Sequence, residues 1–226
     1  MRFVDPSGLI IELAGTEEEQ LTLLYYLNQL TDHTLGVSLS GRVTLQYRAS
    51  SDLQFEYGNT LIERLMAADH VVTIHLFSGA SEFRADCRHE AAMTPGLGSG
   101  GIVRFNPANA LTRTTVSINP STGLAENEIG MYAHIVLGHE LIHADRSMRG
   151  VMLPHASTAL YSFEAARLRF SPARITGGST RTVTHRIRVE ELATIGLARY
   201  TSMCITENMI RQEHGIARRG SHLARV

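Results

Sequence analysis

Hydrophobic positions recur with two periods along the chain, and each period predicts a different kind of element. Leucines recur at helical spacing after Thr16-Glu17-Glu18-Glu19, which has the form of a capping box and predicts a helix there. Residues 60–68 predict a second helix. Short runs rich in β-branched residues predict strands at 9–13, 71–77, 101–105 and 114–118.

From about Leu124 the period changes from two towards 3.6, which predicts one long helix over 126–149 ending before Gly150. Residues 151–184 contain two prolines and a glycine pair, and we expect them to be mostly irregular. Further helices are predicted over 187–200 and from the capping residue Thr206 to about Gly215. Strands followed by helices favour an α+β fold.

The strongest chemical signal is the stretch from Gly138 to His143, Gly-His-Glu-Leu-Ile-His, inside the predicted long helix. Residues four apart on a helix lie one turn above each other, so His139 and His143 can face one zinc ion. Glu140 would not ligate the metal but could activate a water molecule as a general base. The alternative is that both histidines belong to an ordinary solvated or partly buried helix face.

A catalytic zinc needs a third protein ligand and an open position, and no metzincin extension follows His143. Glu191 is favoured over Glu190, because Ile187 and Ile195 lie one turn to either side of it on the predicted helix. The full set of candidates for this third ligand, which must come from farther along the chain, is His155, Glu164, His185, Glu190 and Glu191.

The stretches 139–144 and 189–196 resemble the NleD-like effector metalloproteases and, more remotely, the clostridial neurotoxin light chains. The resemblance runs from about Val71 to the end, including residues 98–101, 106–107 and 206–208, whereas residues 1–60 carry no recognised motif. It implies one zinc metallopeptidase domain over residues 1–226, with its catalytic core at 71–226. The implied fold is zincin-like, with a twisted sheet packed on the motif helix. In the neurotoxin pattern the second Glu of the pair binds zinc, which is Glu191 here.

Proteins of this type also use a late Arg-x-x-Tyr pair to stabilise the oxyanion of the transition state. The matching residues here are Arg219 and His222, so histidine replaces tyrosine. An imidazole can donate the same hydrogen bond, while the alternative is a solvated basic tail. We expect an extended substrate to lie along an exposed strand edge, for which residues 101–105 are the candidate.

The resemblance implies a zinc-dependent endopeptidase, secreted by a bacterium and delivered into the host cytosol, where relatives cleave stress-activated MAP kinases. The implied partner is a host protein, and a monomer is expected. The delivery route stays open, because residues 5–9 match the D-P-x-G-L boundary of Rhs-type toxins and no Ser-rich leader of a type III effector is evident. The rival functions are a non-catalytic partner-binding module and a zinc hydrolase of a non-protein amide, such as a cell-wall peptide.

Composition narrows these functions. The chain has 43% hydrophobic and 19% charged residues and a net charge of −1, so charge does not draw it to nucleic acid or to an acidic membrane. No apolar run reaches the roughly 18 residues of a membrane span, and the N-terminus lacks a secretory signal pattern. Cys87 and Cys204 are not in a C-x-x-C pair, which favours reduced thiols.

All 21 basic residues are arginine. The absence of lysine removes Schiff-base chemistry and fits either a GC-rich genome or escape from ubiquitination in a eukaryotic cell.

Three further patterns in the sequence are weaker indications of function. Residues 96–101 satisfy G-x-G-x-x-G but precede a strand, so we expect a flexible loop flanking the cleft instead of a dinucleotide site. Cys204 near His214 is expected to be a structural cysteine and not a nucleophile. His134 is expected to pack in the core or on the surface.

Overall fold

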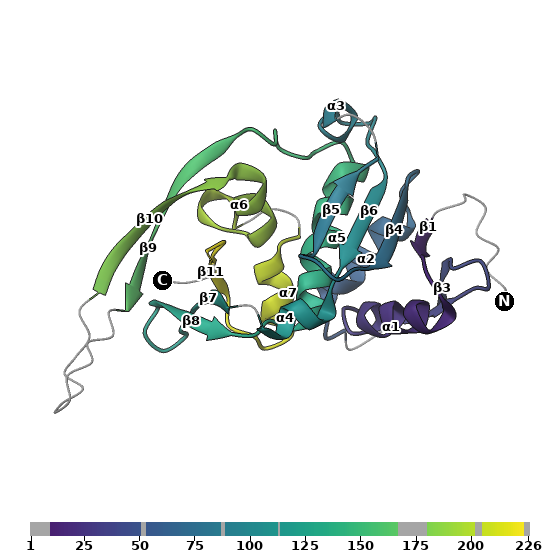
Figure 1. The fold of residues 1–226 in the computed structure, drawn as a ribbon, viewed down its shortest axis with the longest axis horizontal. Coiled ribbons are helices and arrows are strands. Elements are labelled where there is room, and N and C mark those ends of the chain that lie inside the picture. The colour runs from purple at the N-terminus through teal and green to yellow at the C-terminus, as the bar shows by residue number, and fades with distance from the viewer. Residues whose placement is uncertain are drawn as a thin grey trace.

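The computed structural model describes residues 10–50, 53–86, 89–112, 114–166, 180–201 and 205–223 (Figure 1). Cys87, Cys204 and the D-P-x-G-L boundary at residues 5–9 lie outside the described residues. The elements are β1 (Ile10–Leu13), α1 (Glu17–Asn28), β2 (Thr34–Val37), β3 (Val43–Tyr47), α2 (Glu56–Met66), β4 (Val71–Leu76), β5 (Glu82–Ala85), α3 (His89–Ala92), β6 (Gly101–Phe105), α4 (Pro107–Thr112), β7 (Thr114–Ile118), β8 (Ala125–Ile129), α5 (Ala133–Met148), β9 (Thr158–Ala166), β10 (Thr180–Arg188), α6 (Val189–Ile195), a 3-10 turn (Ala198–Tyr200), α7 (Glu207–Glu213) and β11 (Arg219–Ser221).

A four-stranded sheet with the order β1-β4-β6-β5 packs against α5, as the α+β prediction required. Strands β1, β4 and β6 are parallel, and β5 runs antiparallel to β6 at the edge. Alternate side chains of β4 and β6 point inwards, and Val103 and Phe105 share one core with Leu137 and Leu141 of α5. This core fixes α5, the helix that carries the histidine motif, against β6 and the edge strand β5.

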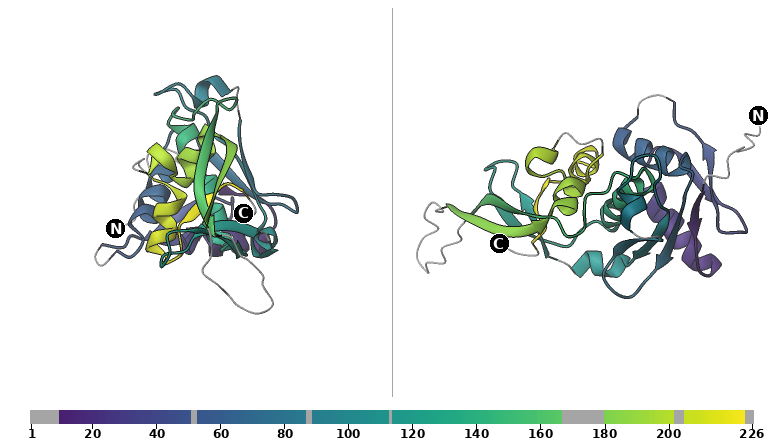
Figure 2. Two further views of the ribbon diagram at one scale, coloured as in Figure 1. Left: turned by 90° about the vertical axis from the view of Figure 1, so that its left-hand side faces the viewer. Right: turned by 90° about the horizontal axis from the view of Figure 1, so that it is seen from above.

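A second sheet has five strands in the order β10-β9-β8-β7-β11. Its long hairpin, β9 and β10, reaches over α6 (Figure 1). Seen from above, the hairpin projects from the body of the molecule (Figure 2, right). The inner face of the hairpin carries Phe163, which packs with Val116 and Ala125. At the base of the hairpin, Ile187 packs with Leu192. The hairpin therefore holds α6 in place. A small third sheet pairs β2 with β3.

The predicted strands at 101–105 and 114–118 are confirmed to the residue, and the other predicted strands are confirmed within a residue at each end. The capping box before α1 is also confirmed, since Thr16 Oγ1 accepts from Glu19 N and Thr16 N donates to Glu19 Oε2. The helix predicted at 60–68 begins earlier, at Glu56, and the cap at Thr206 bonds Met209 N. The starts of α1 and α7 are as predicted because a side-chain cap fixes each of them, whereas α2 has no side-chain cap and its start was misplaced.

The long helix predicted over 126–149 is wrong at its start. Residues 125–129 form β8, which pairs antiparallel with β7, and the helix begins only at Ala133. Gly130 has a φ of 84°, a left-handed conformation that separates the strand from the helix. Strand pairing with β7 thus overrides the helical propensity of the Ala-Glu-Asn-Glu stretch.

The prediction that residues 151–184 are mostly irregular is wrong at 158–166 and 180–184, which form strands, whereas residues 151–157 do lack helix and strand. Residues 158–166 and 180–188 pair in continuous antiparallel register from Thr158↔Arg188 to Ala166↔Thr180. The prolines and glycines that suggested a loop at Pro172, Gly177 and Gly178 lie outside the described residues. The helix predicted over 187–200 is shorter than expected, because Ile187 lies in β10 and Gly196, with a φ of 82°, ends α6.

The edge predicted for substrate, residues 101–105, is wrong, because β6 lies between β4 and β5. The edge strand of this sheet that contacts α5 is β5. The glycine-rich loop does not flank the cleft either. Gly98, Ser99 and Gly100 are buried, and Ser99 exchanges hydrogen bonds of 2.9 and 3.0 Å with Ser147 at the end of α5.

Gly58 sets how closely α2 approaches the backbone at Leu30, just after the end of α1. A Cβ atom on Gly58 would lie 1.7 Å from the carbonyl oxygen of Leu30, a backbone atom that cannot rotate away. We predict that Gly58→Ala lowers the free energy of unfolding by about 1–3 kcal/mol, measured by urea denaturation. Thr60→Ala on the same helix is the control and should stay within about 0.5 kcal/mol of the parent protein. Equal unfolding midpoints for both variants would contradict the close approach.

His134 lies in the first turn of α5 and packs against His214 of the α7 terminus, with ring centroids 4.7 Å apart. Burial, together with the charge of His214, lowers the pKa of His134 from 6.5 to about 4. The unfolded chain therefore takes up a proton between pH 6.5 and 4 that the folded chain does not, so stability is greatest above this window and falls as the pH drops through it.

We predict that His134→Phe, which keeps an aromatic ring against His214, makes stability less dependent on pH in this window. Urea midpoints of metal-free parent and variant near neutral pH and near pH 5 measure the difference, so effects common to both proteins cancel. An equal loss of stability on acidification in both proteins would show that His134 does not contribute.

Candidate metal centre

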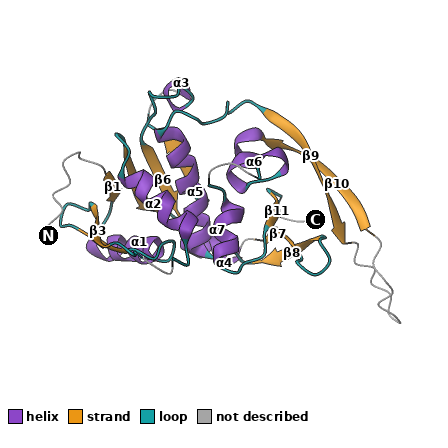
Figure 3. Ribbon diagram, turned by 180° about the vertical axis from the view of Figure 1, so that it is seen from behind, coloured by secondary structure: helices purple, strands orange, loops and turns teal. Residues whose placement is uncertain are grey.

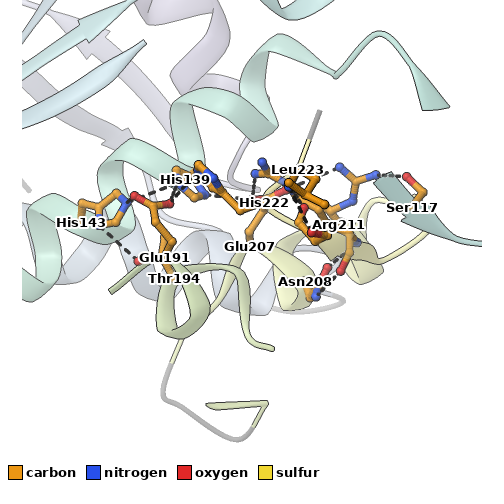
Figure 4. Close-up of polar contacts among 12 residues, drawn as sticks. Ser117, His139, His143, Glu191, Thr194, Glu207, Asn208, Arg211, His222 and Leu223 are labelled. Atoms are coloured by element: carbon orange, nitrogen blue, oxygen red, sulfur yellow. Dashed lines mark hydrogen bonds and ion pairs between the residues drawn. The ribbon is translucent and has the colours of Figure 1, made fainter. Parts of the chain in front are cut away.

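Three side chains from two helices meet at one point. The motif helix α5 places His139 Nε2 and His143 Nε2 3.2 Å apart. The facing helix α6 brings Glu191, whose Oε2 lies 3.2 Å from His139 Nε2 and whose Oε1 lies 3.5 Å from His143 Nε2 (Figure 4). Among the described residues, these three form the group whose potential ligand atoms all lie within 4.8 Å of one another.

These separations fit a tetrahedral metal ion. Ligands at about 2.0–2.1 Å from zinc in tetrahedral geometry lie about 3.3 Å from each other. Two separations of 3.2 Å match that edge length: the one between the two Nε2 atoms and the one from His139 Nε2 to Glu191 Oε2. The other Glu191 oxygen, Oε1, lies 3.5 Å from His143 Nε2. Two imidazole nitrogens and one carboxylate oxygen are also the donor types of a catalytic zinc site with an open fourth position.

Glu207 of α7 holds His139 from behind. Its Oε2 accepts a 2.8 Å hydrogen bond from His139 Nδ1, and the glutamate side chain is fully buried. Arg219 Nη1 donates to the same carboxylate oxygen at 2.8 Å, and Arg211 lies 3.5 Å from the other. With its Nδ1 proton engaged in this way, His139 presents Nε2 to the metal position.

Glu190 plays the corresponding part for His143. Its Oε1 lies 3.2 Å from His143 Nδ1, and Thr194 Oγ1 is equally close. Glu190 is itself held by Arg146, through contacts of 2.8 and 3.2 Å, and by the Leu153 N–H at 2.7 Å. The adjacent glutamates of α6 therefore lie on opposite sides of one imidazole, with Glu191 at the metal position and Glu190 behind the ring.

The pKa values show that the site favours a positive charge. Burial alone would lower the pKa of both histidines, but hydrogen bonds to the glutamates outweigh it, raising His139 to about 9 and His143 to about 10. The pKa of Glu190 falls to about 2 despite burial, because His143 and Arg146 bind the carboxylate. The pKa values of Glu191 and Glu207 are lowered in the same way. The same carboxylates that raise the pKa of these histidines would stabilise a metal cation at this position.

The three ligand candidates open into a cleft of about 650 Å³. The edge strand β5 forms one wall, and Met152, His155 and Arg188 form part of the opposite side. Glu140 also lines the cleft and is 8% exposed, and its charge is among the causes that raise the pKa of His143.

Arg219 and His222 both line this cleft, but in different ways. Arg219 is 4% exposed, and its guanidinium binds Glu207 and the Ser221 carbonyl oxygen at 3.0 Å. The side chain of His222 is more open, and its Nε2 lies 3.3 Å from Glu191 Oε2. His222 therefore points into the cleft, whereas the positive charge of Arg219 is directed at Glu207.

The remaining candidates for the third ligand lie elsewhere. Glu164 bonds Thr182 on the outer part of the hairpin, His185 bonds Ser221, and His155 lines the cleft without joining the ligand group. The sequence argument for Glu191 used Ile187 as a helical neighbour, which is wrong, yet Glu191 does lie at the histidines.

Sequence reasoning missed Glu207, Thr194 and the supporting position of Glu190. Glu207 follows the capping residue Thr206, and its position gave no hint that it would be buried against the motif helix.

Comparison with family models identifies the class of protein. Residues 37–222 match the model of peptidase family M91, described as effector proteins. The chain belongs to this family of effector peptidases, which is the NleD-like family that the motif resembled. The match begins at residue 37, earlier than the Val71 at which the resemblance was placed. No curated protein matches the chain. No helix among the described residues is long and apolar enough to cross a membrane.

We predict that Glu207→Gln weakens zinc binding by about 10- to 100-fold, because His139 loses the carboxylate that orients it. Competition with a chromophoric chelator measures the affinity. Asp145→Asn is the matched control: it breaks a 2.7 Å ion pair with Arg149 on the same α5 helix without touching a ligand candidate. Zinc affinity of Glu207→Gln equal to that of this control would contradict the orienting role.

Proposed function

We propose that the chain is a zinc-dependent endopeptidase with a zincin-like fold, acting as a bacterial effector or toxin on a host protein. His139, His143 and Glu191 are the proposed zinc ligands. The observation that carries the proposal is their tetrahedral spacing in a buried site that opens into a cleft beside Glu140. Membership of an effector peptidase family supports a protein substrate.

When bound, zinc would supply Lewis-acid polarisation and a water molecule of lowered pKa. Glu140 takes a proton from the attacking water while the oxygen of that water forms a bond to the carbonyl carbon of the peptide. When the C–N bond breaks, the same carboxyl group passes this proton to the leaving amine nitrogen. The position of Glu140 in the cleft wall, next to His139, supports this role.

His222 and Arg219 are proposed to stabilise the oxyanion, but through different contacts. His222 lies in the cleft beside Glu191, where an imidazole N–H can donate to the developing negative charge. Arg219 is bound to Glu207, so its main effect passes through Glu207 to His139. This would make His222 the direct donor and Arg219 a positioning residue.

The substrate is proposed to bind as an extended segment against β5. This strand is the edge of its sheet beside α5, and residues 80–85 line the cleft, so its outer backbone groups can pair with a peptide. A host protein with an accessible extended loop fits such a site. The activation loop of a stress-activated MAP kinase is the first candidate. The enzyme is proposed to be delivered into the host cytosol and to act there as a monomer.

A closed structural metal site is a weaker alternative. Structural zinc sites usually use four protein ligands, whereas the ligand group here has three members and faces a cleft. A zinc hydrolase of a non-protein amide shares the same chemistry and is separated from a protease by substrate profiling.

We predict that Glu140→Gln keeps one zinc per chain but lowers cleavage by about 10²- to 10⁴-fold, because the proton transfer is lost. Metal analysis and labelling of new protein termini in host-cell lysate measure both properties together. Glu18→Gln on the surface of α1 is the control and should cleave normally. Zinc in both proteins with cleavage of cell-wall peptides alone would favour the non-protein amide, and absence of zinc would contradict the metallopeptidase.

A further inference from the structure

We infer that Arg188 binds an acidic side chain of the substrate and so selects a peptide with Asp or Glu close to the cleaved bond. This inference rests on the proposed peptidase function. It concerns the side of the cleft opposite β5, where β10 ends and α6 begins; both lie to the left of β5 in Figure 1.

The position of Arg188 is fixed by two neighbouring elements. It is the last residue of β10, in register with Thr158 of β9, and it is followed directly by the helix that carries Glu191. Only two residues therefore separate it in sequence from Glu191, a proposed zinc ligand. Its side chain is exposed and lines the same cleft as Glu140 and His143. A substrate that reaches the metal position therefore enters a cleft that this side chain lines.

Charge pairing sets Arg188 apart from the other charged residues of the cleft. Most of these already have a partner of opposite charge: Glu82 with Arg84, Glu190 with Arg146, Arg219 with Glu207, and Glu191 with the two histidines. In the part of the chain that the structure describes, no ion pair or hydrogen bond of the Arg188 side chain is found, and the same holds for Glu140. Glu140 has a chemical task in the proposed mechanism. Arg188 is the cationic group left to bind substrate.

The chemistry of the guanidinium defines the ligand. Arginine keeps its charge at all relevant pH values and presents a planar set of donors that matches a carboxylate in two-point contact. A peptide lying between β5 and Arg188 would cover the exposed guanidinium and reduce its contact with water, which strengthens the pairing. A basic side chain in the same position would meet like charge.

Arg186 provides a matched control. It lies two residues earlier on β10 and is also exposed, but its Nη1 donates to Thr158 Oγ1 at 3.1 Å and it is not among the residues that line the cleft. A change of charge at Arg186 alters the net charge of the protein and of the hairpin as much as a change at Arg188. It should leave the local choice of substrate side chain unchanged.

The test is cleavage of a proteome-derived peptide library by zinc-loaded parent protein, Arg188→Ala, Arg188→Glu and Arg186→Glu, with cleavage sites identified by mass spectrometry. We expect Asp and Glu to be enriched at one position near the cut by the parent protein and by Arg186→Glu. Arg188→Ala should remove the enrichment, lowering kcat/KM for acidic peptides by about tenfold and leaving matched neutral peptides unchanged. Arg188→Glu should shift the preference towards Lys and Arg.

An unchanged profile in Arg188→Glu, or a parent profile without acidic enrichment, overturns the inference while leaving the peptidase function intact. If the parent protein cuts no peptide, the peptidase function fails instead, and binding then decides on Arg188. Fluorescence anisotropy of labelled peptides that differ only in one Asp or Lys should show tighter binding of the acidic peptide to the parent than to Arg188→Glu. This difference should shrink as salt rises, because an exposed ion pair is screened. Equal binding of both peptides to the parent overturns the inference.

Discussion

The burial of several charged groups around α5 is the constraint on which the rest of the structure depends. A buried charge without a partner is strongly destabilising, so most of these groups are held by an opposite charge or a hydrogen bond. From the motif helix, His139 leads through Glu207 to Arg219 and Arg211, and Arg211 continues to Glu128 at 2.9 Å. Figure 4 shows His139, Glu207 and Arg211 of this network, with Glu191 on the other side of His139.

Helices and strands on both sides of α5 supply the charged groups of this network. The first sheet and its core hold α5 rigid from one side, while the second sheet and α6 bring carboxylates from the other. Viewed from behind, α5 and α7 lie side by side in the middle of the molecule, with the hairpin reaching outwards (Figure 3). The metal position thus lies where the histidines of α5 meet the carboxylates of α6.

The sequence predicted the parts of this arrangement that depend on local spacing. The histidines four residues apart, the capping box at Thr16 and the strand at 101–105 each follow from a local pattern, and each is found in the structure. The parts that depend on distant pairing were missed or misplaced. Residues 125–129 are a strand only because β7 lies beside them, and the hairpin pairs segments separated by more than ten residues.

The same distinction applies to the site. Glu191 was expected from the resemblance to known proteases and from its apolar neighbours on the predicted helix, one of which, Ile187, lies in β10 instead. Glu207 could not be predicted, because its contact with His139 joins residues 68 positions apart. A glutamate directly after a capping residue ordinarily lies on the surface of a first helical turn, where it interacts favourably with the helix dipole. Tertiary packing of α7 on α5 reverses that expectation.

The direct passage from β10 into α6 links the metal site to the register of a β-hairpin. Glu191 reaches the two histidines only if Arg188 pairs with Thr158, because a slip of one residue turns every side chain of the strand to the opposite face. A slipped hairpin would leave a metal ion with two protein ligands in place of three. Since an ion binds most tightly where all its ligands are present, it stabilises the correctly paired chain over the slipped one. The metal would then act during folding as well, by selecting one register of a strand pair that lies mostly outside the site.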